Sequence, residues 1–287
     1  MNTWVVLLCA TVCVSFSGVF VRLARVNGFI SAFYRILFAF FVVMPAFITK
    51  RRRYDPIDII TCIIGGSIFG YELALWNISV VLLNATVPTL LVNLSCIWIG
   101  LFSFFALKEK LTTTHWIGAA IALFGVMMII GLSSIIHMKI EKGVILAITC
   151  SIMISIYTLI VKKARYRMDA VSVLFYTLLG SMLALIVWAV VGKISVFPQS
   201  RGSWLYLVGL GVVVQGFGYL GINYALGYIS SAKVTLALLL QPVFTGILAV
   251  FLIQERITSS QMCGSVLVLI GLSLSLLQIK GRKSKSS

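Results

Sequence analysis

The sequence predicts an all-α membrane protein of ten transmembrane helices, arranged as two inverted five-helix repeats around a central cavity. Three observations lead to this prediction: the composition, the number of long apolar segments, and a repeat of the first half of the chain in the second. The 287 residues are 61% hydrophobic and 10% charged, with a mean hydropathy of +1.11. Soluble domains are about 45–50% apolar and about 25% charged, so lipid is expected to surround most of this chain.

Ten apolar segments approach or exceed the length of about 20 residues that spans a bilayer as a helix. Lipid offers no partner for backbone N–H and C=O groups, so spanning segments must be helices or strands of a closed barrel. Barrel strands are about ten residues long with alternating polarity, whereas these segments are long and uninterrupted. The predicted helices are Trp4–Val21, Phe29–Ile48, Ile57–Val81, Val87–Leu107, Trp116–Leu132, Gly143–Val161, Ala170–Val191, Trp204–Leu226, Ala232–Ile253 and Met262–Ile279.

The second half of the chain repeats the first at a constant offset of 146 residues. Glu109 corresponds to Glu255, and Asn77 corresponds to Asn223. The alignment of the two halves needs no insertion or deletion between these positions. We expect one repeat over residues 1–138, a second over 139–279, and a basic cytoplasmic tail over 280–287. Five spans are an odd number, so the second repeat enters the membrane from the opposite side. Inverted repeats of this kind are common in transporters, whose sites lie between the halves.

The basic residues are explained by membrane topology. The net charge is +16, and with a cytoplasmic N-terminus the inside connections and the tail carry fifteen Lys and Arg residues against seven outside. Cytoplasmic loops are enriched in Lys and Arg, so both termini are expected in the cytoplasm and the protein in the plasma (inner) membrane. A nucleic-acid partner is not expected, although the net charge taken by itself would suggest one.

Motifs for catalysis, metal binding or ATP hydrolysis are not found in the sequence. The six cysteines lie in predicted helices and form no CxxC or Cys/His cluster, so we expect no metal and no cofactor. His115 and His137 lie near the ends of predicted helices, and neither an HExxH nor a Walker A motif is present. We therefore expect no enzymatic activity, and an intramembrane enzyme or a channel is a remote alternative.

Glu72 is the most informative single residue, because it lies inside the third apolar segment. An acidic side chain that faces lipid costs roughly 2.5–3.5 kcal/mol on insertion scales. Glu72 should therefore face a cavity, be protonated, or be paired. It either binds a cationic substrate group or a coupling proton, or it anchors a buried salt bridge.

Arg35, in the second apolar segment, is the expected partner of Glu72. The two residues lie at similar depths, about 9 Å and about 13 Å from the outer ends of their helices. Arg35 either holds Glu72 ionised or binds a substrate carboxylate with its planar guanidinium group. Alternatively, its side chain snorkels to the outer membrane interface.

Three further candidates lie near Glu72 or its repeat position. Trp76 lies one turn beyond Glu72 on the same helix face, where it would stack on a flat substrate, gate the cavity, or pack against other helices. Asn77 and Asn223 occupy equivalent positions in the two repeats. We expect this pair to hold helices together through hydrogen bonds, because a requirement of the scaffold should survive in both copies.

Other polar and aromatic side chains within the apolar segments complete the expected substrate or proton site. Amides both donate and accept hydrogen bonds, which suits zwitterions and heterocycles. The candidates are the amides of Asn93, Gln215 and Gln241 and the aromatic side chains of Tyr157 and Tyr224.

Pro88 and Pro242 interrupt the fourth and ninth apolar segments, which are equivalent in the repeat. Proline removes a backbone donor and permits a helix bend. Broken helices often line transport sites, although a static kink is the alternative.

The repeated motifs resemble the EamA-type repeat of the drug/metabolite transporter superfamily, and the resemblance covers nearly the whole chain. The first copy reads GGSIFGYELALWN, LNATVPTLLVN and KEKLTTTHWIGAAIALFG, and the second reads GLGVVVQGFGYLGIN, YISSAKVTLALLLQP and QERITSSQMCGSVLVLIG. One departure is that Arg35 and Glu72 have no counterparts in the second copy, where Gly218 occupies the position of Glu72. The cavity is therefore expected to be electrostatically lopsided.

The resemblance implies ten helices in inverted halves and the export or exchange of amino acids and other small metabolites without ATP. We expect a secondary-active exporter of such metabolites. Its expected partners are a small-molecule substrate and the lipid bilayer that surrounds it, with proton coupling as an option. A monomer is favoured. An importer or exchanger of a nucleoside-like, vitamin-like or sulfonium metabolite is the alternative.

The charge distribution leads to a prediction about topology. A reporter that is active only in the cytoplasm should be active when fused to either terminus, and a reporter that is active only in the periplasm should be inactive, because the cationic loops favour cytoplasmic termini. The measurement is the activity of paired cytoplasmic and periplasmic reporters. A C-terminus found outside the cytoplasm would contradict both the count of ten helices and the inverted repeat.

Overall fold

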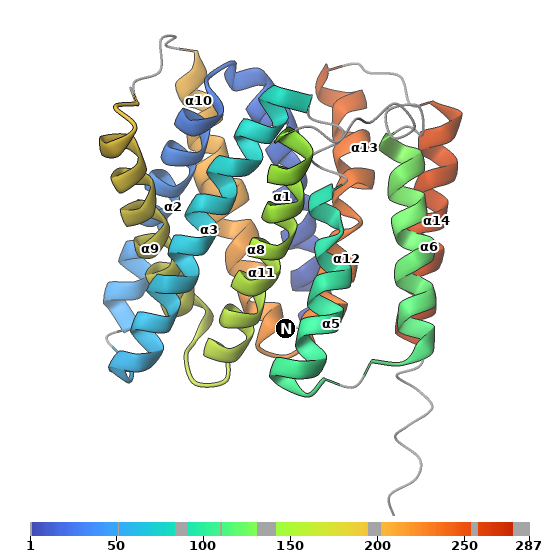
Figure 1. Ribbon diagram of the computed structural model, residues 1–287, viewed down its shortest axis with the longest axis horizontal. Coiled ribbons are helices and arrows are strands. Elements are labelled where there is room, and N and C mark those ends of the chain that lie inside the picture. The colour runs from blue at the N-terminus through green and yellow to red at the C-terminus, as the bar shows by residue number, and fades with distance from the viewer. Residues whose placement is uncertain are drawn as a thin grey trace, which may run out of the picture.

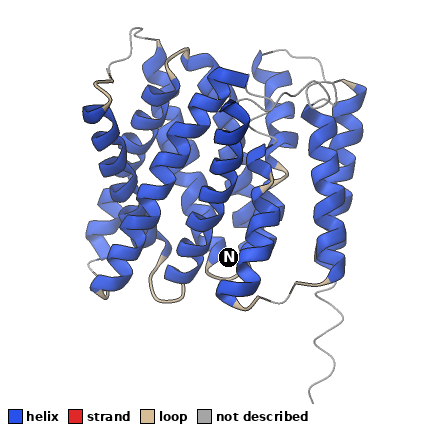
Figure 2. Cartoon of the chain, viewed as in Figure 1, coloured by secondary structure: helices blue, strands red, loops and turns tan. Residues whose placement is uncertain are grey.

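The computed structural model describes residues 2–50, 52–83, 91–109, 111–130, 142–194, 202–253 and 258–277. Within these ranges every regular element is a helix, and the helices stand side by side in one bundle (Figures 1 and 2). The predicted all-helical membrane fold is therefore confirmed. A helix satisfies its backbone hydrogen bonds within one segment, and this is why an apolar chain in lipid adopts it.

The first half contains five named helices. The first begins after Asn2, whose side chain accepts a hydrogen bond of 3.1 Å from the Trp4 N–H, and it ends at Arg25 in the left-handed conformation with φ 49°. A short helical turn at residues 91–93 precedes the fourth. The helices are α1 (Thr3–Ala24), α2 (Gly28–Lys50), α3 (Pro56–Leu83), α5 (Ser95–Leu107) and α6 (Thr113–Ile130).

The second half has the same order of elements and differs mainly by containing a π-helix. The segment from 203 to 226 is continuous and contains a π-helix, and the segment from 231 to 253 is broken in the middle. The elements are α8 (Lys142–Ala164), α9 (Ala170–Val191), α10 (Ser203–Gly209), the π-helix η1 (Leu210–Gly218), α11 (Tyr219–Leu226), α12 (Ser231–Leu238), α13 (Gln241–Ile253) and α14 (Ser259–Leu277).

Seven helical stretches of the described residues are long and apolar enough to cross a membrane. They are Thr3–Val21, Gly28–Lys50, Pro56–Ser79, Lys142–Ala164, Ala170–Val191, Ser203–Leu226 and Ser231–Leu248. Three shorter apolar helical stretches lie at Leu91–Leu107, Thr113–Ile129 and Ser259–Leu274. Each of the ten segments predicted from the sequence coincides with one of these stretches.

The break in the segment 231–253 lies directly before Pro242. Helix α12 ends at Leu238, Leu239 and Leu240 form a turn, and α13 begins at Gln241. Proline removes a backbone donor, and its ring clashes with the carbonyl group four residues earlier, which here belongs to Leu238. A bend at this proline was expected from the sequence. Its expected counterpart, Pro88, lies outside the described residues.

Small residues bring α3 and α9 into direct backbone contact. A Cβ atom at Gly66 would overlap the carbonyl group of Thr177, and one at Gly180 would overlap the carbonyl group of Ile63. The Ser181 hydroxyl donates to the Gly66 carbonyl across the same contact, at 2.7 Å. In lipid the apolar surroundings do not drive helices together, so close packing and hydrogen bonds of this kind hold them.

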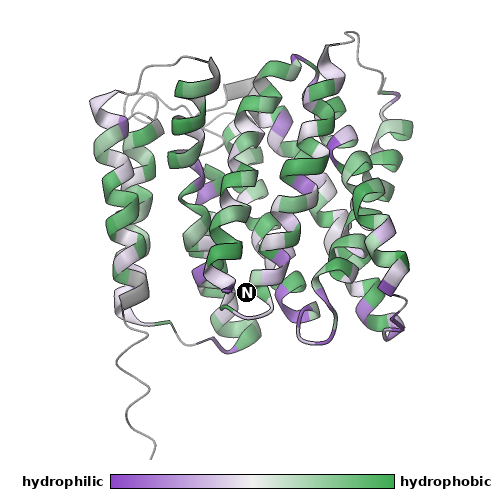
Figure 3. Cartoon of the chain, turned by 180° about the vertical axis from the view of Figure 1, so that it is seen from behind, coloured by the Kyte–Doolittle hydropathy of each residue, from purple (hydrophilic) through white to green (hydrophobic). Residues whose placement is uncertain are grey.

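The outer surface of the bundle is apolar. Among the described side chains Phe251 is 79% exposed, Phe105 78% and Val191 78%. Figure 3 shows hydrophilic residues at the ends of the bundle and at mid-height on the central helices, while the paired α6 and α14 are mainly green and pale. This distribution is the one that a protein immersed in lipid requires.

The α3–α9 contact generates a prediction about stability. Gly66→Ala should lower the free energy of unfolding by about 1–3 kcal/mol, because the added methyl group overlaps a backbone carbonyl that cannot move away cheaply. The measurement is thermal unfolding in detergent. The matched control is Gly246→Ala in α13, where no atom lies within 4 Å of the new methyl group. Equal melting temperatures for the two variants would contradict the tight contact.

Candidate functional site

Arg35 is a buried cation that reaches two other helices. Its side chain on α2 is 6% exposed. Its Nε donates to Oε1 of Gln215 at 2.8 Å, and its Nη1 lies 3.3 Å from Oγ of Ser17 on α1. Its Cζ atom lies 5.5 Å from the centre of the Tyr219 ring, within the range of a cation–π contact. The snorkelling expected as one alternative is excluded, because the guanidinium group points into the bundle.

The π-helix positions the acceptor of this bond. Gln215 lies within η1 and is 1% exposed. A π-helix widens the backbone by one residue per turn and is frequent at functional sites. The sequence predicted a continuous α-helix here. Within η1 a Cβ atom at Gly218 would lie 2.7 Å from Cγ2 of Val14, so this glycine permits a close approach of η1 to α1.

Glu72 is the second buried ionisable side chain, on α3, and is 5% exposed. Arg35 and Glu72 are close enough to interact electrostatically, but they form no ion pair within 4.0 Å. No described residue donates a hydrogen bond to the Glu72 carboxylate. We call Ser17, Arg35, Glu72, Gln215 and Tyr219 the polar cluster. It holds a guanidinium group and a carboxyl group that are near each other but form no direct ion pair.

Aromatic rings border the polar cluster. The rings of Phe69 and Tyr157 stack with their centroids 4.7 Å apart, and the Phe69 and Tyr219 rings are 5.2 Å apart. The Tyr157 hydroxyl is buried near Thr177 without a well-aligned hydrogen bond. The side-chain Nε2 of Gln215 is likewise buried without a partner among the described residues. Each group lacks a well-aligned hydrogen-bond partner among the described residues, and leaving a buried polar group unsatisfied costs about 1–3 kcal/mol.

The sequence did not identify three members of this site. Ser17, Phe69 and Tyr219 were not among the expected residues. Phe69 lies three residues before Glu72, and Tyr219 lies four residues after Gln215, so helix spacing places each on the face of a residue that was expected. Ser17 carries no such signal, since it is one of several serines in an apolar helix.

Other expected site residues lie apart from the polar cluster. Tyr224 contacts Tyr228, with ring centroids 4.9 Å apart, and lines a cavity at the end of the bundle. Asn93, in the short turn before Leu94, has a buried Nδ2 without a partner among the described residues. Gln241 begins α13 and Trp76 lies one turn beyond Glu72, and both are partly buried. No described contact joins these four residues to Arg35.

The asparagine pair packs differently from what was expected. The side chain of Asn77 is buried and donates to the Leu73 carbonyl of its own helix at 2.8 Å. A Cβ atom at Gly28 would overlap this asparagine, so Asn77 joins α3 to α2 by contact. The side-chain amide of Asn223 is buried without a partner in the described part of the chain. The expected interhelical hydrogen bonds are therefore not formed by these side chains.

The polar cluster can bind a molecule that carries both charges. A guanidinium group suits a carboxylate, and a carboxylate suits an ammonium group. The described residues contain no group of three His, Cys, Asp or Glu side chains that could hold a metal ion.

Comparisons with known proteins agree with this reading of the fold. Residues 2–131 and 141–277 each match the EamA-like transporter family. An uncharacterized transporter of Archaeoglobus fulgidus is 22% identical over 256 residues, which cover 88% of each chain. A second from the same organism is 23% identical over 289 residues, 96% of this chain and 98% of its own. A crystal structure with 18% identity superposes with a TM-score of 0.82 over 96% of this chain and 97% of its own, which shows the shared fold.

The two buried charges should be energetically coupled. Arg35→Gln or Glu72→Gln, each made alone, leaves one buried charge without its counterpart and should lower the melting temperature. The double variant should lose less than the sum of the two. The measurement is a double-mutant cycle by thermal unfolding in detergent, with the exposed Arg53→Gln as the control charge removal. Additivity within about 0.5 kcal/mol would show that the two charges do not interact.

Proposed function

Because the chain belongs to the EamA-like transporter family, we propose that it is a secondary-active exporter of small zwitterionic metabolites, amino acids in particular. That it is a membrane transporter follows from its family and its apolar helices. The substrate is supported by one observation in particular: the guanidinium group of Arg35 and the carboxyl group of Glu72 are buried near each other and are not directly paired. A substrate carboxylate would bind Arg35, and its ammonium group would bind Glu72.

The proposed architecture is two inverted repeats of five spans. Helix α3 packs against α8 and α9, as the segment from 203 to 226 packs against α1 and α2. The helix breaks at Leu94 and Leu240 lie 146 residues apart, which is the offset of the sequence repeat. Equivalent helix pairs are also joined by hydrogen bonds. The Ser155 hydroxyl of α8 donates to the Ser95 carbonyl of α5, and the Thr245 hydroxyl of α13, the counterpart of α5, donates to the Ser15 carbonyl of α1, the counterpart of α8. Inverted repeats permit two mirror-related conformations and hence alternating access.

Transport in this scheme is driven by a gradient. Glu72 takes either the substrate ammonium group or a coupling proton, and the carboxyl group changes its partner between the two access states. The protein lies in the plasma (inner) membrane as a monomer with both termini in the cytoplasm, in keeping with the cationic loops. The repeats are assigned to residues 1–138 and 139–279, with the tail at 280–287.

A second candidate is the import or exchange of a nucleoside-like, vitamin-like or sulfonium metabolite. The aromatic border formed by Phe69, Tyr157 and Tyr219 favours it, because aromatic faces stack on heterocycles and attract cations. The two candidates differ in which group of the substrate is bound by Arg35: a carboxylate for amino acids, and a ring acceptor for heterocycles.

Glu72→Gln tests the proposed function. The amide keeps the shape of the side chain but removes its charge and its titration. The variant should be folded, with efflux of labelled amino acids from loaded liposomes reduced at least about tenfold and independent of pH. Tyr71→Phe, on the partly exposed neighbouring residue, is the control. Wild-type flux with an unchanged pH profile in Glu72→Gln would contradict the assignment, and binding of heterocycles without amino acids would favour the second candidate.

A further inference from the structure

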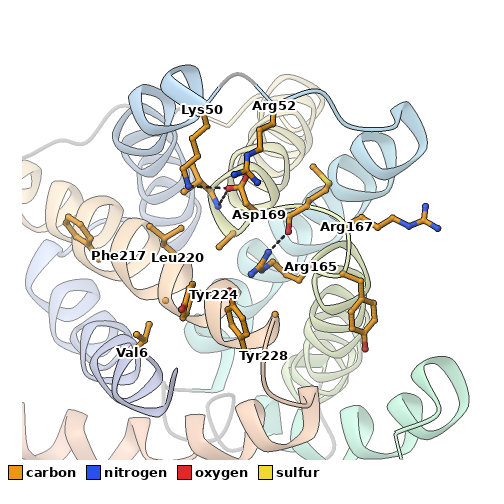
Figure 4. Close-up of a pocket in the computed structure, with 16 residues that line it drawn as sticks. Val6, Lys50, Arg52, Arg165, Arg167, Asp169, Phe217, Leu220, Tyr224 and Tyr228 are labelled. Atoms are coloured by element: carbon orange, nitrogen blue, oxygen red, sulfur yellow. Dashed lines mark hydrogen bonds and ion pairs between the residues drawn. The ribbon is translucent and has the colours of Figure 1, made fainter. Parts of the chain in front are cut away.

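A cavity of about 660 Å³ lies at one end of the bundle. It forms where α2, α8 and α11 end and where α1 and α9 begin (Figure 4). It shares no lining residue with the polar cluster, so the proposed substrate site does not account for it.

The lining of this cavity is strongly cationic. Lys50, Arg52, Arg165 and Arg167 line it together with one carboxylate, that of Asp169. In Figure 4 Lys50 and Arg52 approach the cavity from the end of α2 and Arg165 from the end of α8, whereas Arg167 points away. Arg165 is held in place, because its Nε donates to the Asn223 carbonyl at 2.8 Å and its Nη1 donates to the Met168 carbonyl.

One carboxylate cannot balance four cations, and the carboxylate of Asp169 is already bound by Lys50, Tyr54 and Ser172. Its carboxylate lies 3.6 Å from Nζ of Lys50, and it accepts hydrogen bonds from the Tyr54 hydroxyl and from both the N–H and the hydroxyl of Ser172. Burial opposes ionisation of Asp169, but the hydrogen bonds from Tyr54 and Ser172 outweigh it and lower the pKa to about 2. The carboxylate is therefore ionised and paired at neutral pH.

The remaining cations have no comparable partner. No described residue forms an ion pair with Arg52. Arg167 lies 3.6 Å from Asp58, but its side chain is 71% exposed, and exposed ion pairs are worth at most about 1 kcal/mol. Arg52 consequently presents its positive charge to the cavity without an ion-pair partner among the described residues, and Arg165 is hydrogen-bonded to carbonyl groups and forms no ion pair with Asp169 within 4.0 Å.

The opposite wall of the cavity is apolar and reaches the outer surface of the bundle. Val6, Phe217 and Leu220 line it, and Figure 4 shows them across the opening from Lys50 and Arg165. Phe217 is 60% exposed although it belongs to a stretch that can span the membrane, so its exposed face contacts lipid. One wall of the cavity is thus cationic and the opposite wall is apolar, an arrangement that fits an amphiphile with an anionic head group.

We propose that this cavity binds the phosphate group of an anionic membrane phospholipid, with Arg52 and Arg165 on the phosphate and an acyl chain along Phe217. A guanidinium group binds phosphate through two parallel hydrogen bonds. Basic pockets between transmembrane helices bind anionic lipid head groups on the cytoplasmic side, where the cationic loops place this end of the bundle. The exposed Phe217 favours a lipid over a free phosphate ion, which would gain nothing from the apolar wall.

The full chain in neutral detergent micelles provides the test. Phosphatidylglycerol is titrated into the micelles while the melting temperature is followed, because a ligand that binds the folded protein stabilises it. Wild type should be stabilised by phosphatidylglycerol, and not by phosphatidylcholine or by inorganic phosphate at matched ionic strength. Arg52→Gln should need about fivefold more phosphatidylglycerol for the same effect, the equivalent of about 1 kcal/mol per cation.

Two further variants identify the binding site. Arg53→Gln removes the neighbouring exposed charge, which does not line the cavity, and should respond as wild type does. Phe217→Ala should weaken the response to phosphatidylglycerol. Equal losses in Arg52→Gln and Arg53→Gln would overturn the proposal in favour of diffuse attraction. Stabilisation of wild type by inorganic phosphate to the same extent, or an undiminished response in Phe217→Ala, would overturn the lipid as the occupant.

Discussion

Hydrocarbon offers no hydrogen-bond partner, and this constraint shapes every level of the structure. Hydroxyl groups donate hydrogen bonds to carbonyl groups. The Thr11 hydroxyl donates to the Leu7 carbonyl of its own helix at 2.8 Å, and the Thr245 hydroxyl donates to the Ser15 carbonyl of a neighbouring helix. A guanidinium group has five donors and cannot be satisfied by one such contact. Arg35 therefore draws acceptors from α1 and η1 as well as contacting Tyr219, and a single buried cation constrains how three helices sit together.

The chemistry of the polar cluster arises where the two copies of the repeated sequence differ. Residues 64–72 of α3 are regular α-helix and end at Glu72, whereas the corresponding residues 210–218 form the π-helix and end at Gly218. At the second position the backbone packs so closely on α1 that a Cβ atom would meet the Val14 side chain at 2.7 Å. A larger side chain at that position would require the Val14 side chain to shift. The first copy thus provides the carboxyl group of Glu72, and the second provides the close contact of Gly218 with α1. Gln215 of the second copy is hydrogen-bonded to Arg35 of the first.

Apolar length and end signals in the sequence were enough to predict most of the helices. The predicted Ala170–Val191 has the same bounds in the structure, because Asp169 caps its start and Gly192 follows its end. The sequence placed Arg35 and Glu72 at similar depths, but not the bond from Arg35 to Gln215, since the two residues are 180 positions apart. Tyr224 was expected at the cavity with Glu72, yet it lies five residues beyond Tyr219, about 7.5 Å along the helix axis, which takes it to the other cavity.

An alternating-access cycle of the kind proposed here has to separate some contacts and preserve others. At the end of the bundle near Lys50 several contacts are polar: the Glu109 carboxylate accepts from the N–H and hydroxyl of Ser231, and Lys162 donates to the carbonyls of Leu226 and Ile229. Water can replace each of these bonds, so their separation costs little. The α3–α9 contact has no such substitute, because backbones joined through Gly66 and Gly180 would leave a void in lipid when parted. The physical chemistry therefore favours motion in which α3 and α9 move as one unit and the polar contacts at this end open and close.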